Sequence, residues 1–148
     1  MHRITLQQVS KTKPIPSKNQ FTSWVEQVLP MSKKNHEVVI RIVDLQEITE
    51  LNNKYRKKNK PTNIISFQAD LPPGITVNLL GDLVICAPLV IQEAKLQRQP
   101  LIAHWAHLTI HGILHLLGHN HQKEKAAKKM ESLEVKHLRK LGFANPYQ

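Results

Sequence analysis

The sequence predicts an α+β fold in which a small mixed β-sheet of about four strands is covered by about five helices. Three short runs rich in β-branched residues predict strands, and apolar residues at helical spacing lie between them. From Pro88 onward the pattern is helical throughout. The 148 residues are enough for one hydrophobic core, so we expect a single domain, 1–148.

The N-terminal elements are predicted from capping and apolar spacing. Residues 3–9 are expected to form a strand. Ser17 can cap a helix whose apolar residues recur at helical spacing until Pro30 ends it. Residues 37–43, EVVIRIV, are β-branched and almost continuously apolar, which predicts a buried strand.

The middle of the chain is predicted to continue with one helix and two strands. Asp44 can cap a helix that runs to about Lys58. Residues 62–67, TNIISF, and residues 79–86, LLGDLVIC, then read as strands. Together with residues 3–9 and 37–43, they would complete the sheet.

The C-terminal part is predicted to contain three consecutive helices, over residues 88–98, 101–117 and 122–141. Gly118 and Gly142 follow the last two, and glycine readily adopts the left-handed conformation that commonly ends a helix. The helix 101–117 is apolar around most of its circumference, so it should be largely buried.

Composition limits the possible locations and partners. The longest apolar stretch, Leu83 to Ile91, is broken by Pro88 and is too short to span a membrane. The first ten residues lack the pattern of a secretory signal, and the lone Cys86 cannot form an internal disulfide. We therefore expect a cytoplasmic protein without a membrane partner, and we take a monomer as the default because the sequence leaves the oligomeric state open.

Basic residues exceed acidic ones by 21 to 11, which gives a formal net charge of +10. They cluster in the segment KYRKKNK, residues 54–60, and at Lys123, Lys125, Lys128 and Lys129. Such clusters favour a polyanion such as RNA, although a basic surface can also serve solubility alone. The clusters lack the interleaved aromatic residues of RNA-recognition motifs, so contacts to phosphates are expected rather than base stacking.

The segment HGILHLLGHNH, residues 111–121, carries the strongest functional signal. His111 and His115 are four residues apart on one helix, which lets two imidazoles bind one metal ion. Gly118 lets the chain fold back, and His121 arrives on the returning segment. Three neutral nitrogen ligands with an open fourth position are typical of a catalytic zinc site.

Other histidines compete for a role at this site. His119 is the alternative third ligand, but the Gly118-x-x-His spacing favours His121. His104 lies seven residues before His111, about 10 Å along a helix, and cannot share its ion. His107 is the better candidate for a hydrogen bond that orients a ligand.

The spacing H-x3-H-x2-G-x2-H is that of metzincin proteases, with one decisive difference. Those enzymes have a glutamate after the first histidine that serves as general base and acid, and this chain has Gly112. A peptide leaving group would then lack a proton donor. A phosphodiester can be attacked by a zinc-activated hydroxide and needs positive charge opposite its oxygens, which Arg56 could supply.

HGILHLLGHNH resembles the H-G-x-L-H-L-x-G-Y-D-H signature of the YbeY family of bacterial metallo-endoribonucleases. The segment LNNKYRKKNKPTNIISF is similar to the family's Y-R-x-K-D-x-P-T-N-V-L-S-F segment, and LLGDLVIC and AHWAHLTIHG also match. The likeness covers roughly residues 37–147. Two residues of the signature differ, because His119 and Asn120 stand where the family has tyrosine and aspartate.

The resemblance implies specific roles. One Zn²⁺ per chain would be held by His111, His115 and His121, and Arg56 would be the catalytic arginine. The enzyme would cleave single-stranded RNA in maturation of the 16S rRNA 3′ end and in late-stage 70S ribosome quality control. Its partners would be rRNA and the ribosome or its small-subunit proteins. The same ligands could hold nickel.

Several residues have open alternatives. Arg56 could instead be part of a solvated helix end, and Thr62 and Asn63 could bind substrate or only cap a turn. From the basic cluster, the lysines expected to bind substrate are Lys57, Lys58 and Lys60. The residues expected to orient metal ligands are Asp82, His107 and Asn120.

Two rival functions remain possible from the sequence. One is a zinc peptidase or other metallohydrolase with metzincin-like spacing, against which Gly112 argues. The other is a non-catalytic ribosome-assembly factor with a structural zinc ion, for which a fourth ligand such as His119 would be expected.

Overall fold

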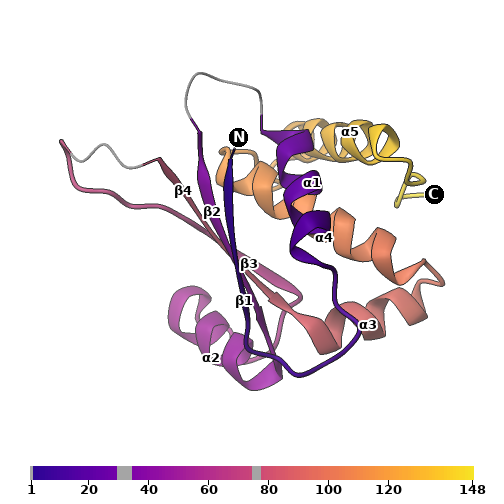
Figure 1. Cartoon of the computed structure of the whole chain (residues 1–148), viewed down its shortest axis with the longest axis horizontal. Coiled ribbons are helices and arrows are strands. Elements are labelled where there is room, and N and C mark those ends of the chain that lie inside the picture. Colours follow the sequence, from indigo (N-terminus) through magenta and orange to yellow (C-terminus); the bar gives the residue numbers. More distant parts are fainter. Residues whose placement is uncertain (1, 30–34, 75–77) are drawn as a thin grey trace.

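Figure 1 shows the computed structural model of the chain, which describes residues 2–29, 35–74 and 78–148. The strands are β1 (Arg3–Gln8), β2 (Glu37–Val43), β3 (Ile64–Gln68) and β4 (Leu79–Cys86). The helices are α1 (Lys18–Val28), α2 (Leu45–Arg56), α3 (Ala87–Leu96), α4 (Leu101–Leu116) and α5 (Glu124–Lys140).

The strands of the described residues form one mixed sheet with the order β1-β2-β4-β3. β1, β2 and β4 are parallel to their neighbours, and β3 is antiparallel to β4. Parallel neighbours need a crossover connection, which α1 provides between β1 and β2. The predicted α+β class, with a small mixed sheet and its covering helices, is confirmed.

Different helices cover the two faces of the sheet (Figure 1). α1 and α4 pack on one face, with α5 against α4, and α2 lies on the other. Side chains of β4 alternate between the two sides, because successive residues of a strand point in opposite directions. Leu83 and Ile85 join the larger core beneath α4, whereas Val84 and Cys86 join the smaller cluster beneath α2.

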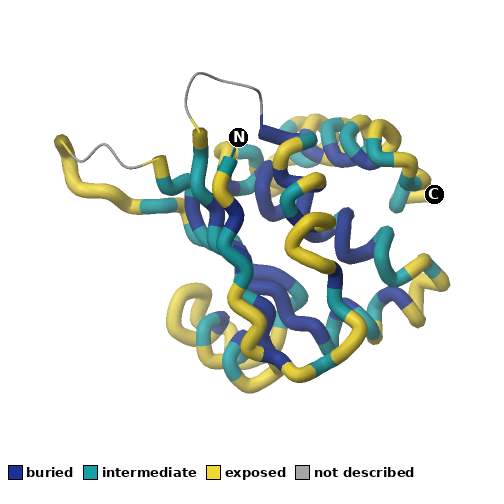
Figure 2. The backbone as a smooth tube through the Cα atoms, in the orientation of Figure 1, coloured by how far each residue is buried: buried dark blue, intermediate teal, exposed yellow. Residues whose placement is uncertain are grey.

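The helix α4 runs through the larger core. Figure 2 shows that burial is concentrated in the central strands and in this helix. Gly112 permits a close approach between α4 and the sheet, since a Cβ atom there would lie 2.7 Å from Leu83 Cδ2 and 2.8 Å from Ile64 Cδ1. The C-terminal turns of α4 are therefore held directly against β3 and β4.

The predicted strands 37–43 and 79–86 coincide with β2 and β4, and residues 3–9 contain β1. The predicted strand 62–67 begins two residues later, at Ile64. The helices predicted over 88–98, 101–117 and 122–141 are α3, α4 and α5, each with ends that differ by one or two residues.

The predicted helix caps have mixed outcomes. Ser17 caps α1 through a reciprocal pair of hydrogen bonds with Gln20. Asp44 occupies the N-cap position of α2 without a capping hydrogen bond from its side chain, because its carboxylate instead accepts from the Ser10 hydroxyl. The first helix ends before Pro30, which lies outside the described residues.

The predicted helix that follows Asp44 ends at Arg56 rather than Lys58. Its end is fixed by Lys57, which adopts a left-handed conformation with φ 56°. No helix within the described residues combines the length and apolar character needed to cross a membrane.

Candidate metal centre and active site

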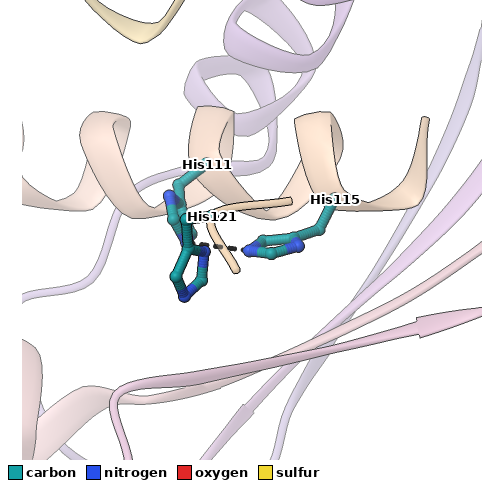
Figure 3. A group of neighbouring side chains, drawn as sticks. All are labelled: His111, His115 and His121. Carbon is teal, nitrogen blue, oxygen red and sulfur yellow. Dashed lines mark hydrogen bonds between the residues drawn. The ribbon is translucent and has the colours of Figure 1, made fainter. Parts of the chain in front are cut away.

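His111 and His115 lie in the last turns of α4 and turn their rings toward each other (Figure 3). Their Nε2 atoms are 3.1 Å apart. Residues four apart share one face of a helix, and the close seat of Gly112 on the sheet directs this face toward β3. Two imidazole nitrogens are thereby aimed at a common point.

His121 completes the group from outside the helix. The chain leaves α4 through Gly118, whose φ of 99° suits glycine, and turns back so that the His121 ring lies 5.1 Å from His115 and 5.6 Å from His111 between ring centroids. One ring nitrogen from each histidine lies within 4.8 Å of the other two. Within the described residues, no fourth histidine, cysteine, aspartate or glutamate belongs to this group.

The three nitrogens fit a metal ion by spacing and by chemistry. Two nitrogens at the usual Zn–N distance from a tetrahedral ion are about 3.4 Å apart, close to the 3.1 Å between His111 and His115. Neutral imidazole suits zinc and other late transition metals. A set of three leaves one coordination position for water or substrate, as in catalytic zinc sites.

A buried carboxylate on α5, Glu134, orients the first of these histidines. Glu134 is only 1% exposed, and its Oε1 accepts a hydrogen bond from His111 Nδ1 at 3.1 Å. Because a carboxylate can only accept, Nδ1 carries the proton and Nε2 keeps its lone pair for a metal ion. This histidine–carboxylate pairing is typical of metal sites.

Two further groups hold Glu134 in place. His107 Nε2 donates to Glu134 Oε1 at 2.7 Å, and the Tyr147 hydroxyl donates to Oε2 at 3.0 Å. Burial alone would raise the pKa of Glu134, but the hydrogen bonds from His107 and His111 outweigh it and lower the pKa to about 2. Glu134 is therefore ionised and supplies negative charge behind the metal-binding nitrogens.

The pKa of His115 is lowered to about 4, first by burial and then by the positive charges of its neighbours, Arg56 among them. A neutral His115 keeps the lone pair that a metal ligand needs. The same shift indicates that the Arg56 guanidinium is close enough to influence the histidine group.

Arg56 and the three histidines line one pocket of about 490 Å³. Arg56 is the last residue of α2, so the left-handed Lys57 that ends this helix also fixes where Arg56 stands. Thr62, Asn63, Ile64, Ser66 and Gln68 provide the wall that includes β3. The structure thus places Arg56 and the histidine group in the lining of one cavity.

The basic residues of the segment 54–60 do not all lie at the pocket. Lys57, Lys58 and Lys60 are exposed and do not line the pocket, although Arg56 does. The loop that carries them is held by buried Asn52, whose side-chain amide donates to the Lys60 carbonyl at 2.8 Å. In the sequence these lysines lie between Arg56 and Thr62, which both line the pocket, and their exposed side chains are accessible to an extended substrate.

Thr62 and Asn63 both line the pocket. The Asn63 side-chain amide also donates to Glu93 on α3 at 3.1 Å, and its backbone carbonyl accepts from Cys86. Asn63 therefore connects β4 and α3 to the wall of the site, a structural role in addition to the expected substrate contact.

Asp82, which was expected to orient a metal ligand, lies on the other side of the sheet from the histidine group. In β4 it pairs with Phe67 and points, like Val84, to the α2 side of the sheet, whereas the histidines lie on the α4 side. The alternation of side chains along a strand separates them. Burial raises the pKa of Asp82, but the acceptor for His111 is Glu134.

His119 and Asn120 also line the pocket, from the turn between α4 and α5. The Asn120 side-chain oxygen accepts from the Gln122 backbone at 3.2 Å, which shapes the turn that carries His121. On the opposite wall, Gln68 donates to the carbonyls of His115 and Leu116 at the end of α4. Gln68 was not among the residues expected at the site.

Glu134 was also missed from the sequence, although a signal for it was present. Met130, Glu134 and Leu138 are spaced four apart and form the buried stripe of α5. A carboxylate in such a stripe requires a buried hydrogen-bonding partner, because an unpaired buried charge is costly. His107, on the facing helix, was expected to support a metal ligand, and it does contact Glu134.

Comparison with known proteins identifies the family. The model of the family described as endoribonuclease YbeY matches residues 5–142. The chain belongs to the YbeY family. YbeY proteins are metal-dependent endoribonucleases of rRNA maturation, so RNA is the substrate class of the family.

A solved structure shares the YbeY fold of this chain. The solution structure of TM1509 from Thermotoga maritima is similar with a TM-score of 0.58 and 20% sequence identity, over 96% of this chain and 92% of that one. At this identity the likeness establishes a common fold and no more.

Proposed function

We propose that this chain is a zinc-dependent endoribonuclease specific for single-stranded RNA. Its role would be maturation of the 16S rRNA 3′ end and late-stage 70S ribosome quality control, in contact with ribosomal small-subunit proteins in the cytoplasm. The observation that carries the catalytic part is the shared pocket, whose lining includes three convergent histidines and Arg56. Family membership supports the rRNA substrate.

His111, His115 and His121 would hold the zinc ion. When bound, zinc supplies a Lewis acid that lowers the pKa of a water molecule and polarises the phosphodiester. Glu134 keeps the proton of His111 on Nδ1, away from the pocket. Arg56 donates from its planar guanidinium to the phosphate oxygens, where negative charge grows as phosphorus is attacked.

The exposed lysines at residues 57, 58 and 60 would bind RNA backbone phosphates outside the pocket. Thr62, which lines the pocket, would contact the RNA inside it. None of these contacts requires a paired strand. The pocket leaves His111 and His115 partly buried and His121 exposed, so an unpaired strand could bring its backbone to all three histidines.

A peptidase is disfavoured at the position that distinguishes metzincins. Replacing Gly112 by glutamate would drive the new side chain into Leu83 and Ile64, since even a Cβ atom approaches both within 3 Å. The backbone that seats α4 on the sheet therefore leaves no room for the acid that proteolysis uses. A structural zinc site is disfavoured because the histidine group within the described residues has three members rather than four.

Metal analysis coupled to RNA cleavage tests this proposal. Wild-type protein should contain about one zinc per chain and cleave a single-stranded RNA while sparing the same sequence in a duplex. His115→Ala should lose both zinc and cleavage. Arg56→Gln should keep zinc and lose about 10²–10³-fold in kcat, the usual effect of removing a group that stabilises transition-state charge.

His119→Ala is the matched control, because His119 lines the same pocket without belonging to the ligand group. It should retain zinc. Loss of zinc in this variant would favour a closed, structural site. Cleavage that persists in metal-free His115→Ala would refute the assigned chemistry.

A further inference from the structure

The catalytic pocket is the first of three cavities that adjoin one another. A second cavity of about 370 Å³ shares Asn63 and His111 with it. A third, of about 610 Å³ along α5, shares Tyr147 with the second. Since shared lining residues mark neighbouring openings, the three cavities follow one another from Arg56 to the outer side of α5.

The third cavity, here called the α5 groove, is basic. Its cations are Lys128, Lys136, Arg139 and Lys140, against the single carboxylate of Glu131. Lys128 pairs with Glu124 at 3.4 Å. In the part of the chain that the structure describes, the other three cations form no ion pair, so their charges are available to an anionic partner.

The electrostatics of the last turn of α5 agree with this charge balance. The pKa of His137 is lowered, first by burial and then by Lys136 and Lys140. The positive charge at this turn thus disfavours protonation of the His137 imidazole. A polyphosphate backbone is the complementary partner, because each phosphate carries one negative charge and several can be matched in series.

Tyr147 stands where the second cavity meets the α5 groove and is 48% exposed. Its hydroxyl is fixed on Glu134 and its ring packs edge-on against His107, with centroids 5.4 Å apart. The ring is therefore held in place while part of its surface remains open. Fixed, exposed aromatic rings are the groups on which unpaired bases stack.

The second cavity is suited to a nucleoside rather than a phosphate. Glu93 lines it, and His104 Nε2 and Asn63 Nδ2 hold its carboxylate at 2.9 Å and 3.1 Å. A carboxylate repels phosphate but accepts from donors, and ribose 2′-hydroxyls and exocyclic amines are the donors of RNA. From the catalytic pocket to the α5 groove, the cavities thus offer in turn a cation (Arg56), a hydrogen-bond acceptor (Glu93), an aromatic ring (Tyr147) and the α5 cations.

We propose that single-stranded RNA extends from the catalytic pocket past Tyr147 and that its backbone docks in the α5 groove on Lys136, Arg139 and Lys140. The inference rests on the proposed function, because it assigns a path to the same substrate. It predicts that a short RNA confined to the catalytic pocket does not use the groove, whereas a longer RNA does.

The test compares Lys136→Gln/Lys140→Gln with a matched pair, Lys11→Gln/Lys18→Gln, which removes two exposed lysines outside the three cavities. Binding of a labelled 20-nucleotide single-stranded RNA is measured by fluorescence anisotropy at 4 °C over a salt series, with probe integrity checked on a gel. The α5 pair should bind several-fold more weakly, and the magnitude of its salt slope should fall by about 1.4, or about 0.7 for each lost phosphate contact. The control pair should match wild type.

Substrate length separates this inference from the proposed function. In zinc-loaded protein, the α5 variant should raise KM for the 20-nucleotide RNA and leave kcat/KM for a trinucleotide unchanged. Equal effects of both lysine pairs, or wild-type binding by the α5 pair, would overturn the docking path. If wild-type protein binds the long RNA through α5 but cleaves neither RNA, the docking path stands and the nuclease function falls.

A stacking role for Tyr147 gives a second readout. Tyr147→Phe keeps the ring, so it should bind the long RNA like wild type, whereas Tyr147→Leu should weaken binding. Equal binding by the two variants would remove Tyr147 from the path.

Discussion

Among single residues, Glu134 orients a histidine of the proposed metal site from another helix. It is absent from the pocket lining, yet it determines which nitrogen of His111 carries a proton. Three donors converge on its two oxygens, from His107, His111 and Tyr147. Its hydrogen bond with Nδ1 fixes the orientation of the His111 ring and leaves Nε2 free for a metal ion.

Glu134→Gln should weaken zinc binding by about 10–100-fold, the usual effect of replacing a group that orients a metal ligand. The glutamine side chain has nearly the same shape but no charge. Its NH2 group would replace one carboxylate oxygen and meet a hydrogen-bond donor from His107, His111 or Tyr147. Zinc affinity measured by competition with a chelator checks this. Glu131→Gln, which removes an exposed carboxylate from the same helix, is the control and should leave zinc affinity unchanged. Equal affinities in the two variants would exclude the role of Glu134.

The residues that sequence could predict are those whose spacing along the chain encodes their geometry. His111 and His115 share a helix face, and Gly118 returns the chain to bring in His121, so a local pattern was sufficient. Glu134 reaches the site from α5, 23 residues after His111, and this helix pairing is not written in any local spacing. Asp82 was misplaced for a related reason, since the face to which it points depends on the register of the sheet.

At the scale of elements, the site depends on how closely α4 lies on β3 and β4. Two glycines, Gly112 on the helix and Gly81 on β4, occupy the contact. At Gly81, with φ 155°, a Cβ atom would fall on the Phe67 carbonyl oxygen and lie 2.7 Å from Leu116 Cδ2. β3 and the end of α4 would both have to move to admit a methyl group.

Gly81→Ala should therefore lower the free energy of unfolding by about 3 kcal/mol, the upper part of the range for an overpacked site. Urea unfolding at neutral pH measures the loss. Gly74→Ala is the control, because Gly74 also has a positive φ but has no atom within 4 Å of its Cβ position, so only about 1 kcal/mol of backbone strain is expected. A loss no greater than that of Gly74→Ala would contradict the clash.

The ends of helices and strands were predicted correctly where local sequence determines them, and less well where distant contacts do. β2 and β4 coincide with their predicted limits, because continuous apolar runs with clear polar ends define buried strands. α2 ends two residues early, since Lys57 adopts a left-handed conformation that sequence does not favour for lysine. Buried Asn52, which holds the following loop, supplies the contact that spacing could not indicate.

At the scale of the whole molecule, resistance to acid should depend on Glu93, which joins α3 to α4 and to the start of β3. Burial acts to raise its pKa, but the hydrogen bond from buried His104, and then that from Asn63, lower the pKa below the ordinary value of 4.5. A carboxylate with a lowered pKa stabilises the folded protein above its unfolded pKa, and this contribution is lost as the pH falls through the folded pKa.

Glu93→Gln should accordingly be less stable than wild type by about 1 kcal/mol at pH 6, with a difference that shrinks as the pH falls below about 4.5. Urea unfolding of both proteins between pH 3 and pH 6 gives the comparison. Glu50→Gln, which removes one exposed carboxylate from α2, controls for the change in net charge. A difference that is constant over this pH range would show that Glu93 acts through packing alone.

The two apolar clusters contain none of the three histidines that face the pocket. The seat of α4 on the sheet depends on apolar contacts such as that of Gly112 with Leu83, which does not line the pocket. We therefore expect the chain to fold without a metal ion, unlike zinc fingers, whose polypeptide is unstructured until the ion arrives. If the histidines hold zinc as proposed, a newly made chain would reach its final shape first and acquire the ion afterwards, so metal supply would govern how many molecules are active rather than how many survive.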